Sequence, residues 1–240
     1  MFLRSWHVRK KIRKLYPENT KMDIFDAGMG FGQYTYFMAK RFPGSEILAV
    51  DVKDEQVEDC RYFFSKCQYG NVKFEIADLT KIEFKNKFEF ILCVDVMEHI
   101  FEDELVFKNF SNALKPGGKL LVNTPSNLGG SDAHSEDDES FIEEHARIGY
   151  SKEDITGKLN RAGLKVTDFS YAYGKYGTIS WRFGIKYPIL MAGYSKFLIL
   201  LLPLYYLFTL WFVLILMWLD VHTDNKEGTG VLVISEKNQY

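Results

Sequence analysis

Short apolar runs alternate with longer amphipathic segments along the first two thirds of the chain. The short runs predict β-strands, and the segments with apolar residues three or four positions apart predict α-helices. Strands are expected at residues 23–26, 45–51, 72–76, 88–94 and 119–124, with helices at 33–41, 54–67 and 102–114. This alternation is typical of a parallel sheet with helices on both faces, an α/β fold.

The pattern continues beyond residue 150. A helix is expected at residues 151–161, with Ser151 as its N-cap and Asp154 three positions on, and Gly163 ends it. Two further strands are expected at residues 164–173 and 230–236. The core fold therefore includes the last few residues of the chain.

A long apolar segment interrupts the pattern between these last two strands, at residues 174–229. Within it, Phe197 to Leu219 form 23 residues without a charge, which is enough to span a bilayer. A single crossing would separate the last strand from its sheet by a membrane. The segment is therefore expected to enter and return within one leaflet, bending at Pro203 or residues 193–196, or to lie along the membrane surface. The alternative is a soluble helical cap, buried against the core or in a homodimer.

The amino-terminal segment is strongly basic, with seven Lys or Arg against one acid in residues 1–21. A helix at residues 3–16 could lie at a membrane with anionic headgroups, or it could simply cover the sheet. The segment lacks the apolar core of a signal peptide, so we expect the amino terminus to stay in the cytoplasm. We divide the chain into this helix at 1–21, a catalytic domain at 22–173 and 230–240, and the insertion at 174–229.

Charge and cysteine content narrow the choice of partners. The net charge of −2 argues against nucleic acid. Three cysteines without Cys-x-x-Cys spacing indicate reduced residues in a cytosolic compartment.

Three glycines, Gly28, Gly30 and Gly32, join the first strand to the first helix of the sheet. Glycines in such a turn let the backbone take positive φ angles or approach a ligand closely. Ligands of parallel sheets lie beyond the carboxyl ends of the strands, where Asp51 suits the two hydroxyls of a ribose and Asp78 suits an adenine amine. No P-loop lysine is present, and Gln33 occupies the third glycine position of a dinucleotide motif, so a pyrophosphate is poorly served.

These motifs, taken together, resemble the class I S-adenosylmethionine-dependent methyltransferases, particularly the type 11 group that includes ubiquinone-pathway O-methyltransferases. The matching stretches are residues 26–32, Asp51, residues 77–78, Val-Asp-Val-Met-Glu-His-Ile at 94–100 and Leu-Lys-Pro-Gly-Gly at 114–118. The resemblance implies a Rossmann-like seven-stranded sheet whose last strand is antiparallel. It also implies S-adenosylmethionine as cofactor, bound by Asp26, Gly28, Gly30, Gly32, Asp51, Val52, Asp78, Leu79 and Val94.

Methyl transfer to oxygen is an in-line displacement that depends mainly on alignment, with help from a base or a metal. Glu98 and His99 are the candidate bases. In the ubiquinone-pathway relatives a Glu-x-x-Glu-His at this place is associated with a divalent metal, which implies Mg²⁺ on Asp95, Glu98 and His99. The alternative is that Glu98 and His99 cap the next helix and close over the cofactor.

Two loop histidines are further candidates for contact with the acceptor. His145 belongs to a Glu-His-Ala-Arg sequence that resembles the His-x-Arg of many relatives, and His134 is a weaker candidate.

We therefore expect a methyltransferase at the inner face of the cytoplasmic membrane, acting on an oxygen of a lipophilic, membrane-resident acceptor. One alternative is a soluble acceptor with the insertion as a lid or dimer interface. The other is a membrane-anchored binding protein without catalytic activity.

Overall fold

A computed structural model describes residues 2–67, 69–129 and 146–238. In these residues one seven-stranded sheet has the order β3-β2-β1-β4-β5-β7-β6. The strands are β1 (Asp23–Ala27), β2 (Glu46–Asp51), β3 (Val72–Ile76), β4 (Phe88–Val94), β5 (Leu114–Pro125), β6 (Leu164–Ala172) and β7 (Gly230–Lys237). Only β7 runs antiparallel to its neighbours, which confirms the expected fold.

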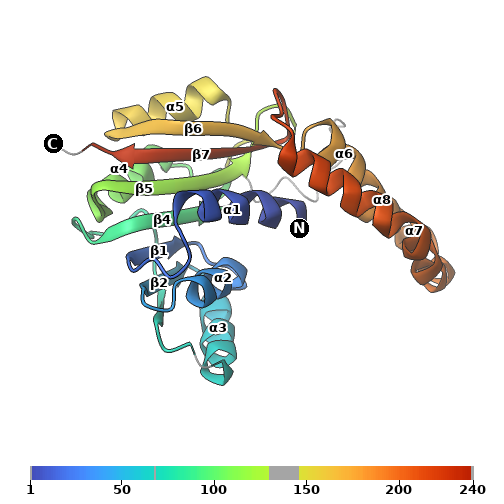
Figure 1. Cartoon of the computed structure of the whole chain (residues 1–240), viewed down its shortest axis with the longest axis horizontal. Helices are drawn as coiled ribbons and strands as arrows, with labels where there is room; N and C mark the ends of the chain where they lie inside the picture. Colours follow the sequence, from blue (N-terminus) through green and yellow to red (C-terminus); the bar gives the residue numbers. More distant parts are fainter. Residues whose placement is uncertain (1, 68, 130–145, 239–240) are drawn as a thin grey trace.

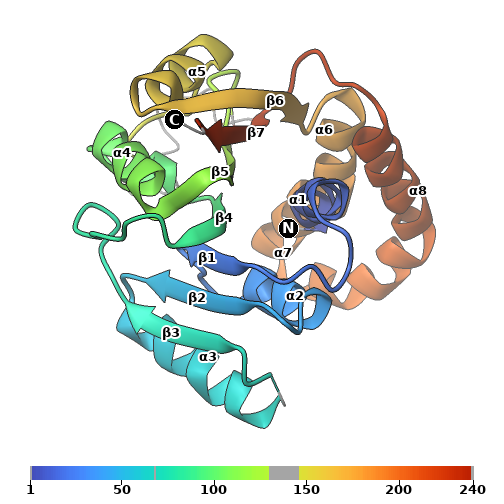
Figure 2. The same cartoon turned by 60° about the vertical axis from the view of Figure 1, so that its left-hand side comes forward.

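Helices cover both faces of the sheet (Figures 1 and 2). Helices α1 (Phe2–Leu15), α2 (Gln33–Arg41) and α3 (Asp54–Lys66) lie on one face, and α4 (Asp103–Ala113) and α5 (Lys152–Arg161) on the other. Side chains of a strand alternate between its faces. Ile24 therefore joins the core beneath α1, α2 and α3, while Phe25 joins the core beneath α4 and α5.

The strand β5 begins five residues earlier than the sequence predicts. Phe88 pairs with Leu114 and Phe90 with Lys119, so the Lys-Pro-Gly-Gly segment forms a bulge inside the strand. The prediction of a turn at 115–118 ahead of the strand was wrong, because a bulge keeps both sides of such a segment in the ladder.

Helix α1 packs on the sheet. Leu3, Val8 and Ile12 are buried, while Lys10 Nζ donates to Val221 O at 2.6 Å and Lys11 pairs with Asp168. Basic side chains here reach across to neighbouring elements while their helix covers the core. The packing thus favours the covering helix over the membrane-surface helix.

The apolar insertion folds into a helical hairpin, residues 175–222. One leg consists of α6 (Lys175–Trp181), the π-helix η2 (Arg182–Lys186) and α7 (Tyr187–Tyr194); the other consists of the 3₁₀-helix η3 (Lys196–Leu201) and α8 (Leu202–His222). The chain reverses at Ser195, whose backbone is extended. The hairpin starts beside the end of β6 and projects away from the sheet (Figure 1).

The two legs of the hairpin are joined by specific contacts. Tyr205 and Tyr206 donate their hydroxyls to Phe183 O at 2.7 Å and Gly184 O at 2.9 Å. A Cβ on Gly184 would lie 3.0 Å from Val213 Cγ1, so glycine lets the legs approach closely. Specific contacts therefore hold the two legs together, and two of the π-helix carbonyls accept hydrogen bonds from the other leg.

The distal surface of the hairpin is apolar and exposed. By length and composition, Lys196–His222 could cross a membrane. Only 6% of its most apolar 18-residue stretch is buried. Phe208 and Trp211 are 74% and 71% exposed. The apolar residues thus face outward, and the hairpin does not pack against its own sheet as a buried cap would.

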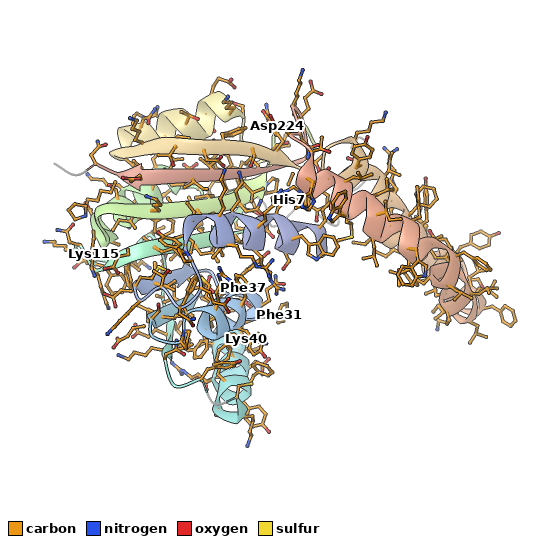
Figure 3. The ribbon with its side chains drawn as sticks, in the orientation of Figure 1. His7, Phe31, Phe37, Lys40, Lys115 and Asp224 are labelled. Atoms are coloured by element: carbon orange, nitrogen blue, oxygen red, sulfur yellow. The ribbon has the colours of Figure 1, made fainter. Side chains whose placement is uncertain are left out.

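The base of the hairpin is held by a buried carboxylate, Asp220. Its oxygens lie 2.9 Å from His7 Nε2, 3.1 Å from Tyr173 N and 2.9 Å from Gly177 N. His7 lies where α1 meets the base of α8 (Figure 3). One side chain on α8 therefore joins α1, the end of β6 and α6.

Candidate active site

The glycine turn between β1 and α2 forms a cradle at the carboxyl ends of the strands. A Cβ on Gly28 would lie 2.2 Å from Val96 Cγ2, whereas a Cβ on Gly30 would meet nothing within 4 Å. Both residues have positive φ angles, 79° and 52°. Gly28 is therefore needed for packing below the turn, and Gly30 leaves an open surface above it.

Asp51, at the end of β2, is bonded to this turn. Its Oδ2 accepts from Gly30 N at 3.0 Å and its Oδ1 from Lys53 N at 3.1 Å. These bonds orient the carboxylate beside the open surface of Gly30. The side chain of the next residue, Val52, is apolar and exposed. It is therefore available to pack against a ring of a bound ligand.

Asp26 lies buried at the base of the cradle. Thr35 Oγ1 donates to its Oδ2 at 2.6 Å. Burial raises the pKa of this carboxyl to about 7, although the Thr35 bond opposes the shift. A cation bound above the turn would favour the ionised form.

Asp78 is engaged in its own turn. Thr80 donates to Oδ1 through its backbone N at 3.0 Å and its hydroxyl at 2.7 Å, and Lys81 Nζ lies 3.0 Å from Oδ2. The Thr80 and Lys81 hydrogen bonds lower the Asp78 pKa to about 2. Leu79 is buried and Val94 half-buried. Contact of Asp78 with adenine stays a prediction.

Three residues that the sequence analysis did not select meet at the same edge: Arg4, Tyr34 and Tyr173. Arg4 pairs with Asp95, and its charge acts on both tyrosines. Burial raises the pKa of Tyr34 to about 12, and the Tyr34 hydroxyl has no hydrogen-bond partner in the described part of the chain. An unpaired buried hydroxyl at a cradle is a candidate ligand group.

Known proteins match this arrangement. A family model described as "Methyltransferase domain" matches residues 18–163. The chain belongs to this methyltransferase family. Its relatives and structural neighbours include proteins named as methyltransferases, and one of these structures contains S-adenosyl-L-methionine.

Two curated relatives illustrate the range of acceptors in the family. Phosphoethanolamine N-methyltransferase 1 of Triticum aestivum is 33% identical over 102 residues, which cover 41% of this chain and 20% of the relative. The ubiquinone biosynthesis O-methyltransferase of Coxiella burnetii is 26% identical over 102 residues, covering 42% of each protein. The matched part of the chain thus spans less than half the length of either relative.

Solved structures confirm the fold over nearly the whole chain. The [4+2]-cyclase SpnF gives a TM-score of 0.65 at 15% identity, covering 97% of this chain and 80% of SpnF. Phosphoethanolamine N-methyltransferase 2 of Haemonchus contortus, in complex with S-adenosyl-L-methionine, gives 0.66 at 20% identity, covering 95% and 51%.

The predicted Mg²⁺ ligands of the methyltransferase do not converge. The 3₁₀-helix η1 (Met97–His99) leaves His99 exposed, while Glu98 is buried and accepts from Thr124 Oγ1 at 3.0 Å. Asp95 pairs with Arg4 on α1. No group of three His, Cys, Asp or Glu that could hold a metal occurs in the described residues, so the structure does not support the predicted Mg²⁺ site on these three.

Of the loop residues considered for contact with the acceptor, only Arg147 lies in the described part of the chain. His134 and His145 lie outside the described residues. Arg147 pairs with the buried Asp103 and donates to Ile100 O at 2.6 Å. Arg147 is therefore an anchor for the chain around α4.

Proposed function

We propose that this methyltransferase acts on an oxygen of a lipophilic acceptor that resides in the cytoplasmic leaflet of a membrane. One observation carries the proposal: the exposed apolar hairpin leaves the sheet at the edge where the glycine turn and Asp51 lie. In Figure 3, His7 at the hairpin base and Phe31 on the glycine turn lie on one side of the molecule, and Lys115 lies at the other. A bilayer that covers the hairpin would thus face the cofactor site.

The hairpin is proposed to lie in the plane of the membrane. The first leg has 20 residues and the second has 27, or about 30 Å and about 40 Å at a rise of about 1.5 Å per residue. A perpendicular hairpin would carry Arg182, Lys186 or Lys196 into the hydrocarbon core, at about 2.5 to 3.5 kcal/mol per charge. An in-plane hairpin keeps these cations among the headgroups while its apolar residues sink about 5–10 Å.

The residues of the cradle suit S-adenosylmethionine. When bound, the cofactor supplies a methyl group activated by the sulfonium sulfur. We assign the ribose hydroxyls to Asp51, which the Gly30 and Lys53 amides orient. Asp26 lies where its negative charge would favour a cationic ligand. Arg4 and the unpaired Tyr34 hydroxyl offer donors for a carboxylate.

The acceptor proton needs a base in this proposal. His99 is exposed at the end of η1 and is assigned this role together with His145. Glu98 is buried and accepts a hydrogen bond from Thr124, and we assign it the role of positioning the end of β5.

The test incubates the full chain with methyl-labelled cofactor and vesicles made from a membrane lipid extract. Label is expected in an organic-soluble product whose mass and fragmentation place the methyl group on oxygen, and the Asp51→Ala protein should transfer far less. Label only in water-soluble products would overturn the membrane-resident acceptor. Label on nitrogen would overturn the choice of atom.

A further inference from the structure

A cavity of about 300 Å³ lies between α1, α6 and α8. We call it the α1–α8 cavity. Its lining includes Leu3 and Trp6 from α1, Trp181 and Ile185 from the first leg of the hairpin, and Leu210 and Leu214 from α8. Figure 2 shows α1 end-on, with the sheet on one side and the hairpin helices on the other.

The interior of this cavity offers few free polar groups. Ser180 Oγ donates to Gly177 O at 2.7 Å and the Tyr206 hydroxyl to Gly184 O at 2.9 Å. Both hydroxyls therefore already donate to backbone carbonyls. Cavities of this kind hold water poorly and bind hydrocarbon, and the volume is at the lower end of ligand pockets, which run from about 300 to 1,000 Å³.

One side of the cavity is continuous with the apolar surface of the hairpin. Leu210 lines the cavity and is itself 44% exposed, and its neighbour Trp211 belongs to the outer face. A chain leaving the bilayer would therefore meet apolar side chains along its whole path.

The other side of the cavity leads to the cradle through Tyr173. Tyr173 lines the cavity, and Arg4 lies close enough for its positive charge to oppose the rise in the pKa of Tyr173 that burial causes. Tyr173 directly follows β6, and its φ of 56° is unusual for a bulky residue. Such strain persists where surrounding contacts hold a side chain in place. Arg4, next to the lining residue Leu3, pairs with Asp95, which directly follows β4 at the cradle edge of the sheet.

We propose that the α1–α8 cavity receives the hydrocarbon chain of the methyl acceptor and directs its head group toward Tyr173 and Arg4. This inference rests on the proposed function. A single linear or prenyl chain fits this volume, so the acceptor would carry such a chain.

The test uses 10-bromodecan-1-ol, whose bromine quenches tryptophan fluorescence on contact. The chain has four tryptophans; replacing Trp211→Phe and Trp218→Phe leaves Trp6 and Trp181, both in the cavity lining. With this protein on vesicles of phosphatidylcholine and phosphatidylglycerol, quenching is expected to saturate. Excess decan-1-ol should reverse it, and hexan-1-ol should not.

Two matched variants separate the cavity from the membrane surface. In the same background, Leu214→Phe narrows the cavity and is expected to weaken the probe at least tenfold, while Ile215→Phe, at a position 59% exposed on the outer face, leaves it unchanged. Unaltered cofactor affinity in Leu214→Phe shows that the variant is folded. If it is not, Leu210→Phe takes its place. Quenching that is linear in probe, or equal in both variants, would overturn the inference.

The proposed function and this inference can fail separately. Saturable quenching without any lipid methylation would leave a hydrocarbon site in a protein with another acceptor. Lipid methylation with linear quenching would leave the enzyme and remove the cavity from its mechanism.

Discussion

Asp51 is the side chain on which the placement of the cofactor depends most directly. We predict that Asp51→Ala weakens S-adenosylmethionine binding at least tenfold, since hydrogen bonds to a charged acceptor contribute about 1.5 to 3 kcal/mol. Titration calorimetry measures the change. Asp51→Asn keeps one acceptor oxygen toward the Gly30 amide. Its cofactor affinity should lie between those of the wild-type protein and the Asp51→Ala variant. An unchanged affinity in the alanine variant would place the ribose elsewhere.

We predict that Asp26 makes cofactor binding dependent on pH. Its pKa is raised by burial from 3.8 to about 7, so between these values the folded protein holds a proton that the unfolded chain releases. Its contribution to stability is therefore full below about pH 4 and is lost as the pH rises toward 7. A cationic cofactor favours the ionised carboxylate, so its affinity should fall as the pH drops below 7, by up to about tenfold per unit.

Calorimetry between pH 5.5 and 8.5, in two buffers of different ionisation enthalpy, checks this prediction. Proton release on binding should appear below pH 7 and vanish in Asp26→Asn. If the wild-type affinity is flat over this range, the carboxylate does not face the cationic part of the cofactor.

The single residues that the sequence revealed are those whose role is local. Gly28 and Gly30 adopt positive φ angles within one short turn, and such a requirement is legible in glycine spacing. Arg4 and Tyr34 were missed because their positions depend on how α1 crosses the sheet. The pair of Arg4 with Asp95 joins residues 91 positions apart, and no local pattern encodes it.

At the scale of elements, the buried carboxylate on α8 decides how α1 and the hairpin dock. We predict that Asp220→Ala lowers the free energy of unfolding by at least about 3 kcal/mol, because three buried donors lose their acceptor at about 1–3 kcal/mol each. Denaturant unfolding in one fixed detergent measures this change.

Asp224→Ala is the matched control for this prediction. Asp224 is exposed on the loop that follows α8 (Figure 3), and its replacement should change stability by less than about 0.5 kcal/mol. Equal stability of the two variants would show that Asp220 does not hold the hairpin base.

Element boundaries followed from periodicity wherever one element had one pattern. The helix α2 and the strands β3 and β4 have the predicted bounds, since each is a short run between clear turn residues. Prediction was wrong for β5, where a bulge lies inside a strand, and the metal site is not supported, because Glu98 of η1 is buried while His99 is exposed. Both outcomes depend on pairing and packing with distant residues.

For the whole molecule, the order of strands and helices already indicated the parallel sheet, and the resemblance to the class I methyltransferases implied its antiparallel last strand. The insertion was recognisable by its uncharged length, and the topological objection to a single crossing agrees with the hairpin that the structure shows. The sequence left a buried helical cap open as the alternative, because the exposure of the apolar side chains depends on how the helices pack against the sheet.

The pairing of Ala172 with Gly230 has a consequence for how such a protein can evolve. These residues are partners in the β6–β7 ladder, and the entire hairpin lies between them. To the sheet, 57 intervening residues are equivalent to one long loop, because the ladder closes directly at its base. Mutations at the tip can therefore change the exposed apolar surface without weakening the sheet, and under the proposed membrane role location and catalysis could then evolve at different rates.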